Sequence, residues 1–271
     1  EFRRVLFRSE LSTAYAHAGG DYHFLQRAYG RAVAFLFGWA RFSVITTGSI
    51  ALLAFVFGDY LQQALPLPSL ARATGATLYA GAVIVVLTLL NLRGIRTGAA
   101  TQGWLTLVEV GGLLLIAGAA AFLADPAPAI ANPGGPAVAS STSYGMAMVF
   151  VLLTYGGWNE AAYISAEVRD GRRCMVKALT LSILVITGLY LLVAWACWHV
   201  LGLDGMAASE ALAADVMRAT VGPAGETVIA LLVAVSALTS INATMIVGAR
   251  TGYAMGCDWP RLGRLGRWDG E

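Results

Sequence analysis

The stretch Leu153-Thr154-Tyr155-Gly156-Gly157-Trp158-Asn159-Glu160 interrupts an apolar segment that runs from about Tyr144 to Ala166. A membrane helix loses backbone hydrogen bonds where it unwinds, and lipid cannot replace them, so an interruption persists only where the freed groups face protein, water or a solute. We therefore interpret the stretch as a broken membrane helix that forms a binding site. The alternative is close helix packing at the glycine pair, because small residues let membrane helices approach each other.

The composition around this stretch is typical of a polytopic membrane protein. The 271 residues are 58% hydrophobic and only 13% charged, whereas soluble domains carry about 25% charged residues. A spanning helix needs about 20 apolar residues. On that basis the sequence predicts an all-α fold with six spans, the second rather short: Ala32–Phe57, Leu78–Leu92, Leu105–Leu123, Tyr144–Ala166, Ala178–Leu201 and Thr227–Ala249.

Basic residues in the predicted loops indicate how the chain is oriented. When alternate loops are grouped, thirteen basic residues fall in one set and two in the other. The larger set is Arg27, Arg31, Arg41, Arg93, Arg96, Arg169, Arg172, Arg173, Lys177, Arg250, Arg261, Arg264 and Arg267, and the smaller is Arg72 and Arg218. Because cytoplasmic loops are enriched in Lys and Arg, we expect the loops around Asp21, Gly94, Asp170 and Asp258 to be cytoplasmic.

Motifs for covalent chemistry, metals or nucleic acid are not found in the sequence. The cysteines and histidines lack the close spacing of metal sites and disulfide frameworks; they are Cys174, Cys197, Cys257, His17, His23 and His199. Nucleophile-elbow, zinc-protease, Walker and dinucleotide motifs are also missing. The net charge of +2 needs no nucleic-acid partner to explain it. We expect no enzyme activity, no cofactor and no metal.

The two ends of the sequence differ from the rest. Glu1–Ser9 is charged and resembles a cloning or sequencing-adapter scar, so we leave residues 1–9 out of the fold reasoning. Residues 10–271 are expected to form a single, incomplete transmembrane domain. Arginine replaces lysine almost throughout, with Lys177 the only lysine, and alanine is abundant. This usage favours a bacterial source and an inner-membrane location.

Three motifs carry a resemblance to the amino acid/polyamine/organocation permeases. They are Glu10–Tyr22, Tyr155–Arg173, and Ser240–Asn242 followed by Arg250–Pro260. The resemblance covers essentially Glu10 to Asp269. It implies that the sequence holds the cytoplasmic end of the second family helix and helices three to eight, and lacks the first helix and the last four.

The resemblance implies a partial five-plus-five inverted repeat of the LeuT-like kind, in which two broken helices hold the substrate at mid-membrane. Only the second of these would be present here. Its exposed carbonyls at Leu153, Thr154 and Gly156 would bind the substrate ammonium. The substrate-binding candidates are Leu153, Thr154, Tyr155, Gly156, Gly157, Trp158 and Asn159. For Tyr155 and Trp158, interfacial anchoring is the alternative.

Two carboxylates, Glu109 and Glu160, lie within predicted spans. Ionisable groups at such depth usually face a cavity and mark a pathway. Many members of the family place a lysine where Glu109 stands, so the charge is reversed here. We expect the two carboxylates to be candidates for carrying a coupling proton or binding a cation. The alternative for Glu109 is a neutral carboxyl group that is hydrogen-bonded within the helix bundle, or a carboxylate near the cytoplasmic surface.

Two further groups of polar residues are candidates by position. Ser240, Asn242 and Thr244 interrupt an apolar span that lines the coupling-ion side of the core in this fold, although Ser and Thr also bond to their own helix carbonyls. Glu167 and Arg169 are cytoplasmic-gate candidates by resemblance, and their alternative role is a solvated loop that sets topology.

These inferences predict a secondary active transporter of amino acids that works by alternating access, most simply by proton symport. An amino acid exchanger and a permease-like sensor without net transport are the alternatives, and a membrane-embedded enzyme is a weaker one. The expected partners are an amino acid, a coupling proton or cation, and the lipid bilayer. We expect residues 1–271 alone to be inactive, because half of the substrate pocket would be missing.

Overall fold

The computed structural model describes residues 17, 19–68, 70–123, 144–154, 157, 171–209 and 211–267. Every regular element in this part of the chain is helical. The elements are α2 (Asp21–Tyr29), α3 (Arg31–Ala40), the π-helix η1 (Arg41–Ile45), α4 (Thr46–Ala64), α5 (Arg72–Leu92), α6 (Ile95–Leu123), α7 (Tyr144–Thr154), α8 (Gly171–Ala208), α9 (Leu212–Val221), α10 (Ala224–Asp258) and the 3₁₀-helix η3 (Pro260–Leu262). A non-helical Gly202 kinks α8 near its end.

Among the described helices, five are long and apolar enough to cross a membrane, and they confirm five of the six predicted spans. They are Arg31–Ala64, Arg72–Leu92, Thr97–Leu123, Lys177–Ala208 and Ala224–Asp258. The second span begins at Arg72 and not at the predicted Leu78, because the more polar residues 72–77 continue the same helix. The segment Tyr144–Ala166 is described only over α7 and at Gly157, and its remainder lies outside the described residues.

The first span is one long helix with a π-helical turn in its middle. α3, η1 and α4 cover 34 residues, which at 1.5 Å per residue is about 50 Å. Two hydroxyls bond to carbonyls along this turn: Ser43 Oγ donates to Trp39 O at 2.6 Å, and Thr47 Oγ1 donates to Ser43 O at 2.7 Å. Such side-chain bonds compete with the regular backbone ladder, which is consistent with the local change in helix type.

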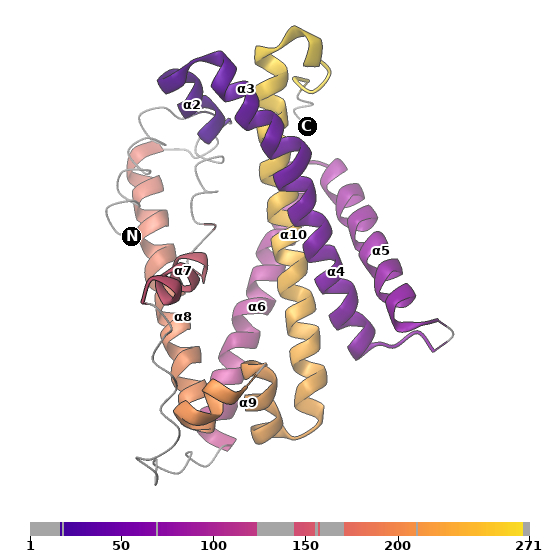
Figure 1. The fold of residues 1–271 in the computed structure, drawn as a ribbon, viewed down its shortest axis with the longest axis vertical. Coiled ribbons are helices and arrows are strands. Elements are labelled where there is room, and N and C mark those ends of the chain that lie inside the picture. The colour runs from indigo at the N-terminus through magenta and orange to yellow at the C-terminus, as the bar shows by residue number, and fades with distance from the viewer. Residues whose placement is uncertain are drawn as a thin grey trace.

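α10 is the central helix, because all three hydrophobic cores include it. One core joins it to α4 and α5, a second to α2 and α3, and a third to α6, α8 and α9. Figure 1 shows α10 running the length of the molecule between α4 and α6. The buried faces of the other spans are therefore organised around one helix.

The two ends of the bundle carry different elements. α2, the start of α8 and the end of α10 lie at one end, and α9 and the end of α4 lie at the other (Figure 1). Two members of the larger predicted set are not in loops: Arg41 lies in η1 inside the first span, and Arg250 is buried within α10. Which end faces the cytoplasm stays a prediction from the positive-inside pattern.

Small residues allow α4 and α5 to pack closely. A Cβ atom on Gly58 of α4 would overlap the backbone carbonyl oxygen of Ala76 on α5, and a Cβ on Gly75 would lie 2.6 Å from Oε1 of Gln62. Gln62 is itself buried, with 6% of its surface exposed. Glycine and alanine at such positions let helix backbones approach, which is how membrane helices gain packing energy.

We predict that Gly58→Ala lowers stability, because the added methyl group must separate α4 from α5. Overpacking of this kind costs about 1–3 kcal/mol. The check is the midpoint of thermal unfolding in detergent. The matched control is Gly81→Ala on α5, where the new Cβ meets nothing within 4 Å; equal midpoints for the two variants would contradict the close α4–α5 contact.

Candidate functional site

The end of α7 lies inside the predicted interruption. The helix ends at Thr154, and Gly157 has φ +88°, a left-handed conformation that a right-handed helix cannot contain and that favours glycine. Tyr190 on α8 donates its Oη hydrogen to the Thr154 carbonyl oxygen at 2.8 Å. A carbonyl at this helix end therefore accepts a hydrogen bond from outside α7, and its role as an ammonium ligand stays a prediction.

Most of the other candidates in this region cannot be placed. Tyr155, Gly156, Trp158, Asn159, Glu160, Glu167 and Arg169 lie outside the described residues, as does the side chain of Leu153. Their roles in substrate binding, coupling and gating stay predictions. Tyr190 was missed by the sequence reasoning, because a tyrosine in an apolar span carries no signal of what its hydroxyl contacts.

Glu109 lies on the interface between α6 and α10. Ser236 Oγ on α10 donates to Glu109 Oε1 at 2.7 Å, and the carboxylate is only partly buried. A serine hydroxyl can donate to a carboxylate or accept from a carboxylic acid, so this hydrogen bond can persist in either protonation state. The contact fits both the proton-carrier hypothesis and the hydrogen-bonded alternative. Ser236 was not among the predicted residues.

A cluster of side-chain amides joins α5, α6 and α10 next to this pair. Asn242 is fully buried; its Nδ2 donates to Gln102 Oε1 at 2.9 Å and to the Gly98 carbonyl at 3.2 Å. Asn91 Nδ2 donates to Asn242 Oδ1 at 2.8 Å and to the Leu87 carbonyl at 2.9 Å. These bonds use both N–H groups of Asn242.

The amide cluster gives Asn242 a structural role that needs no ion. Its predicted place in an ion site stays a prediction. Asn91 and Gln102 were missed by the sequence reasoning. A signal was available for Gln102, because it lies two helical turns before Glu109 on α6 and so shares its face.

Of the two hydroxyl candidates on α10, Thr244 bonds within its own helix: its Oγ1 donates to the Ser240 carbonyl at 2.7 Å. This is the alternative that was open for Thr244, and the role of the Ser240 hydroxyl stays a prediction. The neighbouring Thr239 likewise donates to the Val235 carbonyl at 3.0 Å. The described residues contain no group of three or more His, Cys, Asp or Glu side chains placed to hold a metal.

One end of the bundle is held by contacts between α2 and the end of α10. Tyr22 is buried, and its Oη donates to Asp258 Oδ2 at 3.0 Å. Burial, with the Asp258 carboxylate beside it, raises the pKa of Tyr22 to about 12. Two of the motifs that carry the family resemblance therefore meet here.

A histidine pair borders this contact. The rings of His17 and His23 stack with centroids 4.2 Å apart, and the Gly19 N–H donates to His17 Nδ1 at 3.0 Å. Burial lowers the pKa of His23; His17 and Arg27 lower it further, and Asp258 opposes them. The folded protein therefore disfavours a charge on His23.

Comparison with known proteins assigns the family. The amino acid permease family matches residues 5–258 of the chain. The chain belongs to the amino acid permease family. Permeases are transporters, in agreement with the expectation that the chain is not an enzyme. The expected scar at residues 1–9 overlaps the start of the match and stays a prediction.

Named relatives of this permease chain are amino acid transporters. The mouse b(0,+)-type amino acid transporter 1 is 28% identical over 253 residues, covering 92% of this chain and 51% of the relative. The human large neutral amino acids transporter small subunit 2 is 25% identical over 264 residues, covering 92% and 48%. The chain thus spans about half the length of the curated relatives that it matches.

We predict that Asn242→Ala destabilises the permease chain, because the Asn91 and Gln102 amides lose a buried partner. An unsatisfied buried polar group costs about 1–3 kcal/mol. Thermal unfolding in detergent measures the effect. Thr244→Ala is the control, since its hydroxyl bonds only to its own helix. If both variants unfold at the same temperature, the amide cluster does not hold α5 and α6 to α10.

Acidification should weaken the end that contains His23. The folded-state pKa of His23 lies below the usual 6.5. As the pH drops below about 6.5, the unfolded chain therefore binds more protons than the folded chain, and stability falls. We predict that His23→Gln flattens the dependence of the unfolding midpoint on pH between about 7.5 and 5.5.

His199→Gln on α8 is the control for this experiment. A slope that is the same in His23→Gln and in the unaltered chain would show that His23 does not contribute to acid destabilisation.

Proposed function

We propose that this sequence belongs to a secondary active transporter that moves amino acids by alternating access within a five-plus-five inverted repeat, coupled to proton symport. The observation that carries the proposal is the end of α7 at Thr154, inside an apolar segment and beside a left-handed Gly157. Family membership and the names of the relatives support the substrate class.

The end of α7 suits the ammonium group of an amino acid. The last carbonyls of a helix lack intrahelical partners, and the helix dipole places partial negative charge at this end. The carbonyls of Leu153, Thr154 and Gly156 would therefore bind a cation, and the bond from Tyr190 would orient the Thr154 carbonyl. The substrate ammonium is itself the cation that these carbonyls would bind, so this contact does not require a sodium ion.

Glu109 is the proposed proton carrier. It is a carboxylate in a membrane-spanning helix, at a position where many family members carry a lysine. Its bond to Ser236 tethers it to α10 in both protonation states, so proton uptake and release would not break the α6–α10 contact. Binding or release of the proton would then be coupled to structural changes in other parts of the bundle, while the α6–α10 contact stays intact.

We predict that Glu109→Gln abolishes proton-driven accumulation of amino acids in proteoliposomes. One proton that moves down a gradient of one pH unit releases about 1.4 kcal/mol, which supports about tenfold accumulation. The amide in this variant cannot carry the proton, so amino acid accumulation by the variant should not respond to the gradient. The matched control is Asp59→Asn, an exposed carboxylate on α4.

Uptake is measured for the chain as it stands and for a chain extended to the family's full length, and we expect transport only from the longer one. Unchanged gradient-driven accumulation in Glu109→Gln would exclude Glu109 as the carrier. Uptake that needs amino acid inside the vesicles would indicate exchange, and binding without uptake would indicate a sensor.

A further inference from the structure

A cavity of about 400 Å³ lies between the end of α4, α9 and the first turns of α10. The elements that line it meet at the end of the bundle opposite to α2 (Figure 1). Its polar lining comes from Tyr60, Gln63, Arg218 and Glu226, and its apolar lining includes Leu212 and Ile229. Sites for small molecules commonly measure about 300–1,000 Å³ and combine apolar walls with a few polar groups.

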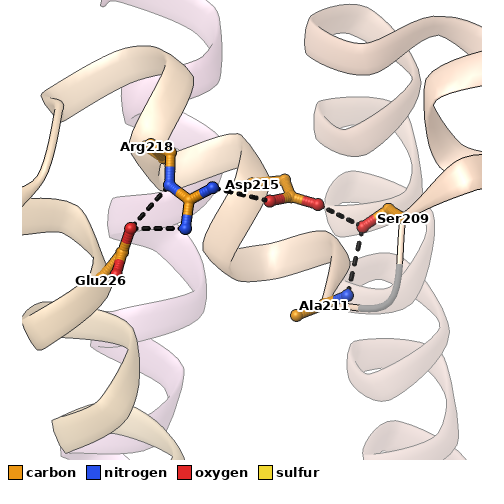
Figure 2. Close-up of polar contacts among 5 residues, drawn as sticks. All are labelled: Ser209, Ala211, Asp215, Arg218 and Glu226. Atoms are coloured by element: carbon orange, nitrogen blue, oxygen red, sulfur yellow. Dashed lines mark hydrogen bonds and ion pairs between the residues drawn. The ribbon is translucent and has the colours of Figure 1, made fainter.

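Both signs of charge line this cavity. Arg218 Nε donates to Glu226 Oε1 at 2.6 Å, and Arg218 Nη2 lies 2.5 Å from the same oxygen. Figure 2 shows the pair bridging α9 and α10. Arg218 and Glu226 have 59% and 37% of their side-chain surface exposed, so a solute can reach them.

Neighbouring groups hold the arginine in place. Asp215 Oδ1 lies 3.8 Å from Arg218 Nη1, and Asp215 Oδ2 accepts a hydrogen bond from Ser209 Oγ at 2.5 Å (Figure 2). Ser209 Oγ in turn accepts a hydrogen bond from the Ala211 N–H at 3.2 Å. The start of α9 and the guanidinium are therefore parts of one network.

The ion pair leaves capacity for a ligand. Both contacts from Arg218 go to Oε1 of Glu226, and the described residues provide no partner for Oε2. A guanidinium has five N–H donors, and the 3.8 Å contact of Nη1 with Asp215 is too long for a hydrogen bond. The cavity thus offers a donor group and an acceptor oxygen side by side, next to an apolar wall.

We propose that this cavity binds a zwitterionic amino acid at a second site, separate from the one at the end of α7. The ligand carboxylate would bind Arg218, its ammonium would bind Glu226 Oε2, and its apolar side chain would contact Leu212 and Ile229. The choice of an amino acid rests in part on the proposed function. With the predicted orientation this site faces outward and collects substrate at the entry side.

Binding to the chain in lipid nanodiscs tests the inference by calorimetry with three probes: leucine, leucine methyl ester and N-acetyl-leucine. Only leucine carries both charges, so we expect it alone to bind. Arg218→Gln and Glu226→Gln should each weaken binding about tenfold or more, because each removes one charge-assisted contact. Asp204→Asn is the control, since Asp204 is an exposed carboxylate on α8 that neither contacts Arg218 nor lines the cavity.

A second variant separates ligand binding from a purely structural ion pair. Leu212→Trp fills the cavity while leaving Arg218 and Glu226 in place, so it should abolish leucine binding with little change in the unfolding midpoint. Equal binding of all three probes, or full binding by Leu212→Trp, would overturn the inference.

The test also separates this site from the proposed transport function. Glu109→Gln should keep binding at the second site. If the extended chain transports amino acids but Arg218→Gln has no effect on leucine binding, only the second site is refuted. Leucine binding that needs Arg218 and Glu226, in an extended chain that transports no amino acid, would refute the transport proposal alone.

Discussion

The described bundle depends on hydrogen bonds between buried polar groups of the protein, because lipid cannot supply partners for them. Asn242 does this at the point where three helices meet, because its buried amide bonds to Asn91 on α5 and to Gln102 and the Gly98 carbonyl on α6. α10 also takes part in each of the three hydrophobic cores. An amide buried in hydrocarbon without partners would be costly, so these bonds fix which faces of α5 and α6 meet α10.

The need for hydrogen-bond partners also explains why a binding site is expected where a membrane helix is interrupted. Thr154 ends α7, and its carbonyl is bonded by Tyr190 from another helix. A broken helix inside a membrane can persist only when such partners exist. In the described structure the partner of the Thr154 carbonyl is the Tyr190 hydroxyl.

The interface between α6 and α10 contains both a cluster of hydrogen-bonded amides and a carboxyl group. The amide cluster and the Glu109–Ser236 bond both lie on it. The amide groups do not titrate, so the hydrogen bonds of the cluster are independent of pH.

The opposite ends of α10 are built differently. Near Asp258 the contacts are mostly buried, and they include Tyr22 and the stacked histidines. Near Glu226 the contacts are ionic and exposed, and they border a cavity. The two ends of α10 therefore differ in how exposed their polar contacts are.

The sequence alone determined the membrane class, the family and five of the spans, because apolar run length and ordered motifs are local properties of the chain. It also indicated an interruption within residues 153–160, and α7 ends at Thr154 inside that stretch. Only the tertiary structure decided that Asn242 pairs with Asn91 and Gln102, that Ser236 reaches Glu109, and that Arg218 meets Glu226. The reason is that these contacts join helices whose facing surfaces are chosen by packing, and packing is not encoded at any single position.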